Sequence, residues 1–295
     1  TKVTEILASR KGIFVAVCDD PWVFRQLAQI QGVEAGDVPR LWLKSLFLIV
    51  RGYLARIQLA WKTLIAVFLF KKHANDIEKQ ETFLLAYAHP SSQSRGHDAY
   101  FGDLTNNIPS IGRVIHTDGS LKFKHRLMGP GTASLHGWGS ASHCFSLIFT
   151  LWSPDFSNSR SDYFWLIKRS VMIENGGAGI AANSWQIHCQ NKFMLELKPK
   201  NILWPWENHP WEREITRYAR DQKIKTIGYQ HAVIGVQQFN PSPKSNHDGL
   251  HSIPSKIICS GEAYYNQLIQ WGIPKKTLVI GGAFRFSKNN CGKYN

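Results

Sequence analysis

Short apolar runs alternate with amphipathic segments along the C-terminal third of the chain. The runs predicted as strands span 201–208, 225–232, 255–261 and 276–284, and the segments predicted as helices span 210–223 and 262–272. Pro210 suits the first turn of one helix, and Gly272 suits the C-terminal end of the other. Strands and helices that alternate at this spacing are typical of a parallel sheet. We therefore predict an α/β fold with a Rossmann-like parallel sheet flanked by helices.

The residues that precede this region fit the same fold less regularly. Apolar runs predict strands at 12–18, 81–90 and 111–119, and helices are expected at 21–31, 98–108 and in parts of 161–195. The Gly-, Ser- and His-rich stretch 120–145 is predicted to be a loop. It does not have the GxxxxGK[ST] order of a phosphate-binding loop. We predict one Rossmann-like domain over residues 1–286.

Residues 41–70 form the most apolar segment of the chain and are predicted to be an amphipathic helix. Four cationic residues interrupt the segment: Lys44, Arg51, Arg56 and Lys62. All of them except Arg56 fall on one narrow stripe of a helix, beside a broad apolar arc. Such a helix fits a buried, domain-packing position, and it also fits the interface of an anionic membrane. A true span is least favoured, because it needs about 20 mostly apolar residues in a row.

The charge of the chain favours anionic partners. The formal net charge is +14, which suits nucleic acid, an anionic membrane surface or a phosphorylated substrate. The basic residues are dispersed rather than clustered, and no known nucleic-acid-binding module is recognisable. We therefore expect no nucleic-acid partner.

The cysteines and histidines give little sign of a covalent or metal framework. The five cysteines are widely spaced and none lies in a CxxC or CxxH pair, so we expect reduced thiols in a cytosolic protein. The twelve histidines include no HExxH pair, and we expect no metal. The N-terminus carries no short apolar stretch followed by a small-residue cleavage site. We expect a cytoplasmic protein, peripheral on the inner face of the cytoplasmic membrane if segment 41–70 contacts lipid.

Polar side chains recur where the predicted strands end. In open α/β sheets, ligands bind outside the carboxyl ends of the strands. This rule selects candidate site residues together with two neighbouring tryptophans: His89, His116, Trp206, Glu207, Asn208, Trp211, Gln230, His231, Glu262 and Arg285. Polar residues are common at strand ends in any case, so the joint pattern counts for more than any single member.

Glu207 is the candidate general base. It lies in the stretch LWPWENHPWER (203–213), which places three tryptophans close to it. A carboxylate beside apolar rings resists ionisation, so we expect the pKa of Glu207 to rise toward neutrality. The alternative is a structural ion pair that links Glu207 or Glu212 to Arg213 or another base.

The remaining candidates also have two interpretations each. His231 is expected to contact a phosphate or transfer a proton, or else to be a buried histidine bonded to the backbone. His209 is expected only to border the following helix. Glu262 lies at a predicted helix N-terminus, where interaction with the helix dipole accounts for a carboxylate without any function.

Four segments in this order resemble bacterial surface-carbohydrate biosynthesis proteins. They are WPWENHPWERE (204–214), IGYQHAVIG (227–235), SKIICSGEAYYNQLIQWGIP (255–274) and LVIGGAFRF (278–286). The upstream segments ETFLLAYAHP and DAYFGDL are similar to the earlier part of the same proteins. The family is similar in outline to capsule Kdo transferases and CDP-glycerol glycerophosphotransferases.

The resemblance implies the acceptor-side half of a GT-B glycosyltransferase. Such an enzyme transfers a sugar from a nucleotide-activated donor to a glycan or lipid-linked acceptor, and it uses no cofactor beyond the donor. In these relatives, the strand similar to LVIGGAFRF closes the N-terminal domain. Residues 287–295 are then a tail or the start of a linker to an absent donor-binding domain. A transferase must deprotonate the acceptor hydroxyl while the nucleotide leaves, and a carboxylate base such as Glu207 suits the first task. A histidine or a positive group, here His231 or Arg285, suits the phosphates.

The resemblance implies that this chain corresponds to the acceptor-side half alone, and we leave open whether it is active by itself. The alternative function is a non-catalytic, membrane-associated glycan-binding or scaffold domain.

Overall fold

The chain divides into two compact units that both contain discontinuous segments. The computed structural model describes residues 2–10, 12–94, 96–154, 164–235 and 237–284. Unit 1 consists of Thr1–Leu59 and Ile148–Ala181, and unit 2 consists of Ala60–Leu147 and Ala182–Asn295.

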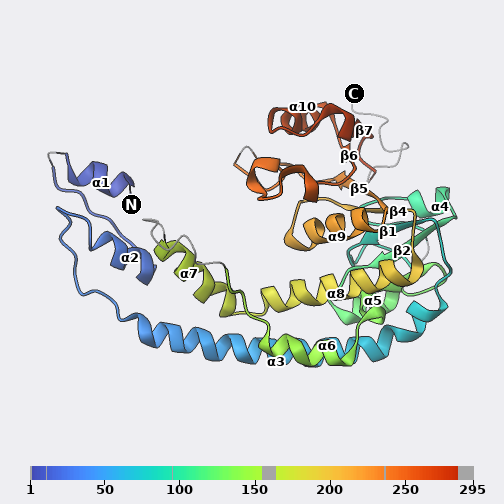
Figure 1. Ribbon diagram of the computed structural model, residues 1–295, viewed down its shortest axis with the longest axis horizontal. Coiled ribbons are helices and arrows are strands. Elements are labelled where there is room, and N and C mark those ends of the chain that lie inside the picture. Colours follow the sequence, from blue (N-terminus) through green and yellow to red (C-terminus); the bar gives the residue numbers. More distant parts are fainter. Residues whose placement is uncertain (1, 11, 95, 155–163, 236, 285–295) are drawn as a thin grey trace. The chain divides into compact units, whose positions relative to one another are not determined.

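Unit 2 is built on a seven-stranded, all-parallel sheet (Figure 1). Its strands are β1 (Thr82–Ala86), β2 (Ile111–Ile115), β3 (Thr132–Ser134), β4 (Asn201–Pro205), β5 (Lys225–Gln230), β6 (Lys256–Cys259) and β7 (Leu278–Ile280). The strand order is β3-β2-β1-β4-β5-β6-β7. The order reverses between β1 and β4, as in doubly wound nucleotide-binding folds. The predicted Rossmann-like α/β fold is confirmed.

Helices flank this sheet and connect several of its strands. Those within unit 2 are α4 (Leu104–Asn107), α5 (Leu121–Leu127), α6 (Ala141–Ser146), α9 (Pro210–Asp221) and α10 (Glu262–Gln270). Short 3₁₀ turns lie at Leu135–Trp138, Leu147–Phe149, Pro243–Ser245, Gly249–Ser252 and Lys275–Thr277. In α9, Pro210 occupies the first turn, and Trp211, Ile215 and Ala219 recur at helical spacing on its buried face.

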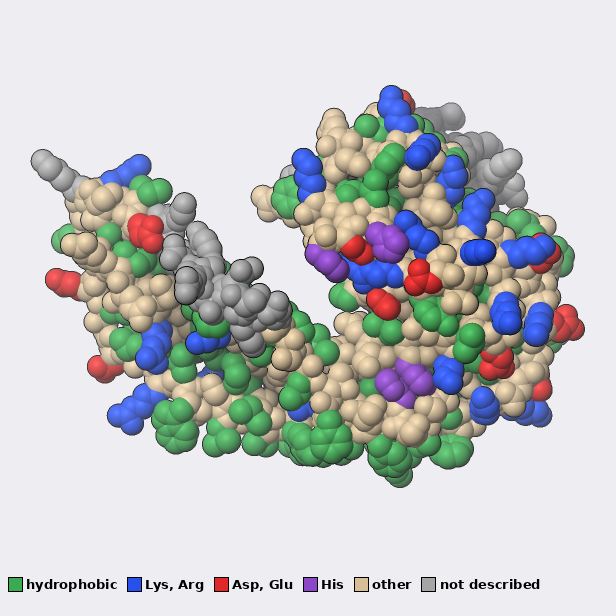
Figure 2. Space-filling model, in the orientation of Figure 1, with side chains coloured by type: hydrophobic (Ala, Val, Ile, Leu, Met, Phe, Trp, Pro, Cys, Tyr) green, Lys and Arg blue, Asp and Glu red, His purple; other side chains and the backbone are tan. Residues whose placement is uncertain are grey.

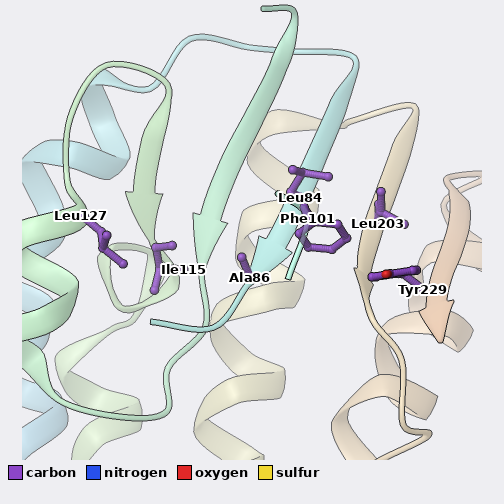
Figure 3. Close-up of a cluster of buried hydrophobic side chains, with 7 residues drawn as sticks. All are labelled: Leu84, Ala86, Phe101, Ile115, Leu127, Leu203 and Tyr229. Atoms are coloured by element: carbon purple, nitrogen blue, oxygen red, sulfur yellow. The ribbon is translucent and has the colours of Figure 1, made fainter. Parts of the chain in front are cut away.

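The core of unit 2 lies on the central strands. One buried cluster consists of Leu84, Ala86, Phe101, Ile115, Leu127, Leu203 and Tyr229 (Figure 3). Strands β1, β2 and β4 are buried at every position after the first, as expected for a parallel sheet covered on both faces. Close packing also selects Gly112, since a Cβ there would lie 2.3 Å from a ring carbon of Phe83.

Unit 1 is helical in the residues that the structure describes. It contains α1 (Lys2–Ala8), α2 (Pro21–Leu27), α7 (Phe164–Asn175), the first part of α3 (Leu41–Asp76) and the first residues of α8 (Gly179–Leu197). Asp20 caps α2 by accepting hydrogen bonds from the backbone of Trp22 and Val23, each at 3.0 Å. Its other carboxylate oxygen accepts a hydrogen bond from Nε of Arg169 on α7 at 2.8 Å.

Three predictions of local structure are wrong. Residues 12–18 form no strand, and Ile13 is 97% exposed, because no neighbouring strand pairs with this apolar run. The stretch 120–145 is not one loop, since it contains α5, β3 and α6. The helix expected over 98–108 is only α4, because the Asp98 carboxylate accepts hydrogen bonds from the backbone of Tyr100 and Phe101 in a turn. The predicted tail at 287–295 lies outside the described residues.

Candidate functional site

A pocket of about 420 Å³ lies at the carboxyl ends of four strands of unit 2. Its lining consists of Tyr87, Tyr100, Asp118, Asn183, Glu207, His209, Pro210, Trp211 and His231. Tyr87 follows β1, Asp118 follows β2, Glu207 follows β4 and His231 follows β5. Strands β1 and β4 are the neighbours between which the strand order reverses, which is where doubly wound sheets bind their ligands. The volume is within the usual range for a small-molecule site.

Glu207 lies between two imidazoles in this pocket. Its Oε2 atom is 2.9 Å from Nε2 of His209, and its Oε1 atom is 3.4 Å from Nε2 of His231. The side chains of Glu207 and His209 are 44% and 45% exposed, whereas that of His231 is only 6% exposed. The carboxylate is therefore open to the pocket and paired on both sides.

These contacts change the expected protonation of Glu207. The hydrogen bond from His209 lowers the pKa of Glu207 below its ordinary value, although partial burial opposes this change. The same hydrogen bond raises the pKa of His209. The predicted rise in the pKa of Glu207 is wrong, because imidazoles rather than tryptophan rings are the groups that contact the carboxylate.

One of the three tryptophans lies against a different carboxylate, that of Glu212 in the first turn of α9. Its Oε2 atom accepts hydrogen bonds from Nε1 of Trp204 at 3.1 Å and from the backbone nitrogens of Glu207 and Asn208 at 3.0 and 2.8 Å. Glu212 is fully buried, and this burial raises its pKa to about 7 in spite of the three donors. Glu212 thus fixes the backbone of the loop that carries Glu207.

Asn208 completes the support of that loop. It is buried and adopts a left-handed conformation with φ of 61°, which asparagine tolerates better than most residues. Its Nδ2 atom donates a hydrogen bond to the carbonyl of Asn240, and Nδ2 of Asn240 donates one to the carbonyl of Glu207. Asn208 was predicted to contact substrate, but it does not line the pocket. It is buried and holds the loop that carries Glu207.

Aromatic rings form much of the remaining surface of the pocket. The Tyr87 and Tyr100 ring centroids are 5.6 Å apart, and the Tyr100 ring meets the His231 ring edge-on at 5.2 Å. Trp211 lines the pocket and lies 6.4 Å from Tyr87, centroid to centroid. His116 is buried behind these rings, 4.6 Å from Tyr87 and 4.4 Å from Trp211. Burial lowers the pKa of His116 well below its ordinary value.

A second polar cluster is buried behind the strand-end loop that carries Asp118. Lys124 of α5 is fully buried and donates a hydrogen bond to the carbonyl of Thr117. Its Nζ atom is also 3.2 Å from Nε2 of His136, whose Nδ1 atom accepts a hydrogen bond from Nε1 of Trp185 at 3.0 Å. Burial lowers the pKa of Lys124 to about 7. This cluster holds the backbone of the Asp118 loop from inside the unit.

Four other predicted site residues do not line the pocket. Gln230 is buried, and its Oε1 atom accepts hydrogen bonds from the backbone nitrogen and hydroxyl of Ser260, so it joins the ends of β5 and β6. Trp206 is buried and packs where a Cβ on Gly228 would lie, 2.9 Å from that position. His89 is exposed and is hydrogen-bonded to Ser91.

Glu262 is exposed on the first residue of α10, and Arg285 lies outside the described residues.

Sequence reasoning missed six residues of the pocket lining: Tyr87, Tyr100, Asp118, Asn183, His209 and Pro210. The strand-end rule contains the signal for Tyr87 and Asp118, since each lies within three residues of the end of a strand. His209 follows Glu207 by two residues and was expected only to border α9. Asn183 lies on α8, where the sequence carries no sign that this helix reaches the pocket.

Comparison of the chain with models of known protein families, with curated proteins and with solved structures gives no match. Within the described residues, no group of three or more His, Cys, Asp or Glu side chains is placed to hold a metal ion. The chemistry of the pocket therefore has to be inferred from its own geometry. A carboxylate between two imidazoles can orient an imidazole for proton transfer, and exposed aromatic faces can bind the apolar faces of sugar rings.

Proposed function

We propose that the pocket of unit 2 binds a sugar acceptor, and that the chain is the acceptor-side part of a glycosyltransferase. The reaction transfers a sugar from a nucleotide-activated donor to a glycan or lipid-linked acceptor in bacterial surface polysaccharide synthesis. The observation that carries this proposal is the His209–Glu207–His231 arrangement in an aromatic-lined pocket at the strand ends. The sequence resemblance to surface-carbohydrate biosynthesis proteins supplies the reaction class.

The Glu207–His209 pair takes up the proton of the acceptor hydroxyl in this proposal. Glu207 accepts the hydrogen bond from Nε2 of His209, which leaves Nδ1 of a neutral His209 as the base. The hydroxyl oxygen bonds to the anomeric carbon of the donor, its proton passes to His209, and the nucleotide leaves with the electron pair of the broken bond. The raised pKa makes His209 a stronger base than an ordinary imidazole, and Glu207 stabilises the imidazolium that forms.

The aromatic rings hold the acceptor next to this pair. Sugar rings present apolar C–H faces that stack on aromatic planes while their hydroxyls bond to polar neighbours. The partly exposed rings of Tyr87 and Tyr100 offer such surfaces, and Asp118 and Asn183 offer hydrogen-bond partners for the hydroxyls.

The test compares Glu207→Gln with Glu262→Gln in the full-length protein. Turnover is measured with a panel of nucleotide sugars and with acceptor glycans from bacterial surface polysaccharides. Loss of the carboxylate at position 207 is expected to reduce turnover by about 100-fold or more, the usual contribution of general acid–base catalysis. Glu262 is exposed and outside the pocket lining, so Glu262→Gln is the matched control and should retain activity. Equal turnover in both variants would overturn the assignment.

The lowered pKa of Glu207 favours one other function, that of a non-catalytic glycan-binding domain. An ionised carboxylate with a lowered pKa is itself a weak base, but it is a good hydrogen-bond acceptor for sugar hydroxyls. This function predicts that the protein retains glycans on an array of bacterial surface saccharides. It also predicts that the protein turns over none of the nucleotide sugars and that Tyr100→Ala, at a partly exposed ring of the pocket wall, abolishes the retention.

A further inference from the structure

Helix α3 has one face covered by protein from Leu48 to Ala74. In unit 1, a Cβ on Gly52 would lie 2.0 Å from the carbonyl oxygen of Asn175, and Arg56 is 4% exposed. In unit 2, Phe70 is fully buried, and a Cβ on Gly137 would lie 2.5 Å from that of Ala74. The buried residues recur at helical spacing, so they lie on one side of the helix and pack against the rest of the protein.

The opposite face of α3 is apolar and exposed. Its centre line consists of Leu43, Val50, Leu54, Ile57, Trp61 and Phe68, which are between 42% and 75% exposed. Their spacing of seven, four, three, four and seven residues keeps them on one side of a helix. Figure 2 shows hydrophobic side chains gathered along α3. A contiguous apolar surface of this length that is exposed to solvent marks an interaction site.

Charges along α3 have one sign until its last residue. The helix contains six lysines and arginines, and its only acidic residue is Asp76 at the C-terminal end. Arg51 and Arg56 are used inside unit 1, where they donate hydrogen bonds to the backbone carbonyls of Gly176 and Asn175. Lys44, Lys71 and Lys72 are exposed at the two ends of the apolar centre line. An apolar surface bounded by cations complements an anionic lipid interface.

Two features distinguish a helix that lies on a membrane from one that crosses it: the length of its apolar face and the burial of its opposite face by protein. An 18-residue window of α3 has a mean hydropathy of 1.4, which is apolar enough for a span by composition. A span would place the face with buried Arg56 in hydrocarbon and remove the hydrogen bonds that satisfy its guanidinium. The exposed apolar face also continues for about 40 Å, longer than the hydrocarbon core of about 30 Å.

We propose that α3 lies in the plane of an anionic membrane surface, with the Leu43–Phe68 centre line in the lipid and Lys44, Lys71 and Lys72 at the headgroups. This surface is separate from the strand-end pocket, so the proposal does not depend on the proposed activity.

The apolar part of the proposal is tested by flotation of the protein with vesicles of phosphatidylglycerol and phosphatidylcholine. Trp61→Glu places a charge on the centre line and is expected to weaken vesicle binding by at least about tenfold. Leu195→Glu is the matched control, because Leu195 is a 52% exposed helical residue of α8. Failure of the unaltered protein to float, or equal binding of the two variants, would overturn the proposal.

The charge part is tested by comparing the double variant Lys71→Gln, Lys72→Gln with Lys225→Gln, Lys275→Gln, a pair of exposed lysines on other elements. The first pair should weaken binding to anionic vesicles more than the second, and vesicles of phosphatidylcholine alone should bind the unaltered protein weakly. Equal binding to neutral and anionic vesicles would overturn the anionic assignment.

A dimer seen by light scattering that Trp61→Glu dissociates, without vesicle binding, would show instead that a second copy covers this face.

Discussion

Two carboxylates five residues apart, Glu207 and Glu212, occupy opposite environments. Glu207 is half exposed between two imidazoles, and its pKa is lowered. Glu212 is fully buried with three N–H donors on one oxygen, and its pKa is raised to about 7. Closeness to tryptophans in the sequence therefore does not show which of two carboxylates the fold buries. In the proposed function, the carboxylate that remains open takes part in the reaction, and the buried one holds the loop that presents it.

The largest expected effect is the loss of stability in Glu212→Ala. Removing the carboxylate leaves the Trp204 indole N–H and two backbone N–H groups without acceptors in a buried place. We expect the free energy of unfolding to fall by about 3–5 kcal/mol, measured by urea denaturation. Glu207→Ala is the control, and its expected loss is at most about 1 kcal/mol because the side chain is half exposed. Similar losses in free energy of unfolding in both variants would contradict the difference in burial between the two carboxylates.

The pH dependence of stability gives a smaller and more specific effect. The folded pKa of Glu212, about 7, exceeds its ordinary value of 4.5. Its contribution to stability is therefore fully present below about pH 4.5 and is lost as the pH rises to about 7. Relative to the unaltered protein, Glu212→Gln should gain up to about 3 kcal/mol over this interval. The difference curve cancels the contributions of the groups that Glu212 does not influence, although Glu212 also raises the pKa of His209. A flat curve would show that Glu212 stays ionised throughout.

The smallest effect is on the protonation of His209. Glu207 raises the pKa of His209, so Glu207→Gln should move this pKa down toward its ordinary value. Two-dimensional NMR of the imidazole signals during a pH titration measures the shift. His136 is a buried internal reference whose pKa is lowered by burial and by Lys124, and it should not move with this substitution. An unchanged His209 titration would mean that the ion pair with Glu207 does not form in solution.

The sequence predicted the central features of the sheet because they depend on local patterns. Apolar runs and strand-end positions placed Glu207 and His231 at one edge, and Pro210 marked the start of α9. The burial of Glu212 could not be predicted, since it depends on a loop that turns through Asn208 with positive φ and places the Glu212 carboxylate against the indole of Trp204. The run 12–18 had the composition of a strand, but pairing requires a neighbour that composition does not reveal. The edge strand β3 has only three residues, too few for a periodic signal.

The burial of Lys124 makes this residue a natural reporter of motion. A lysine with a pKa of about 7 is partly an uncharged amine at neutral pH, the form that reacts with acylating reagents. Its Nζ atom is sealed against the Thr117 carbonyl and the His136 ring, so the reagent meets it only when α5 moves away from the sheet. The rate at which Lys124 is acylated in the native protein would therefore measure how often this part of unit 2 opens.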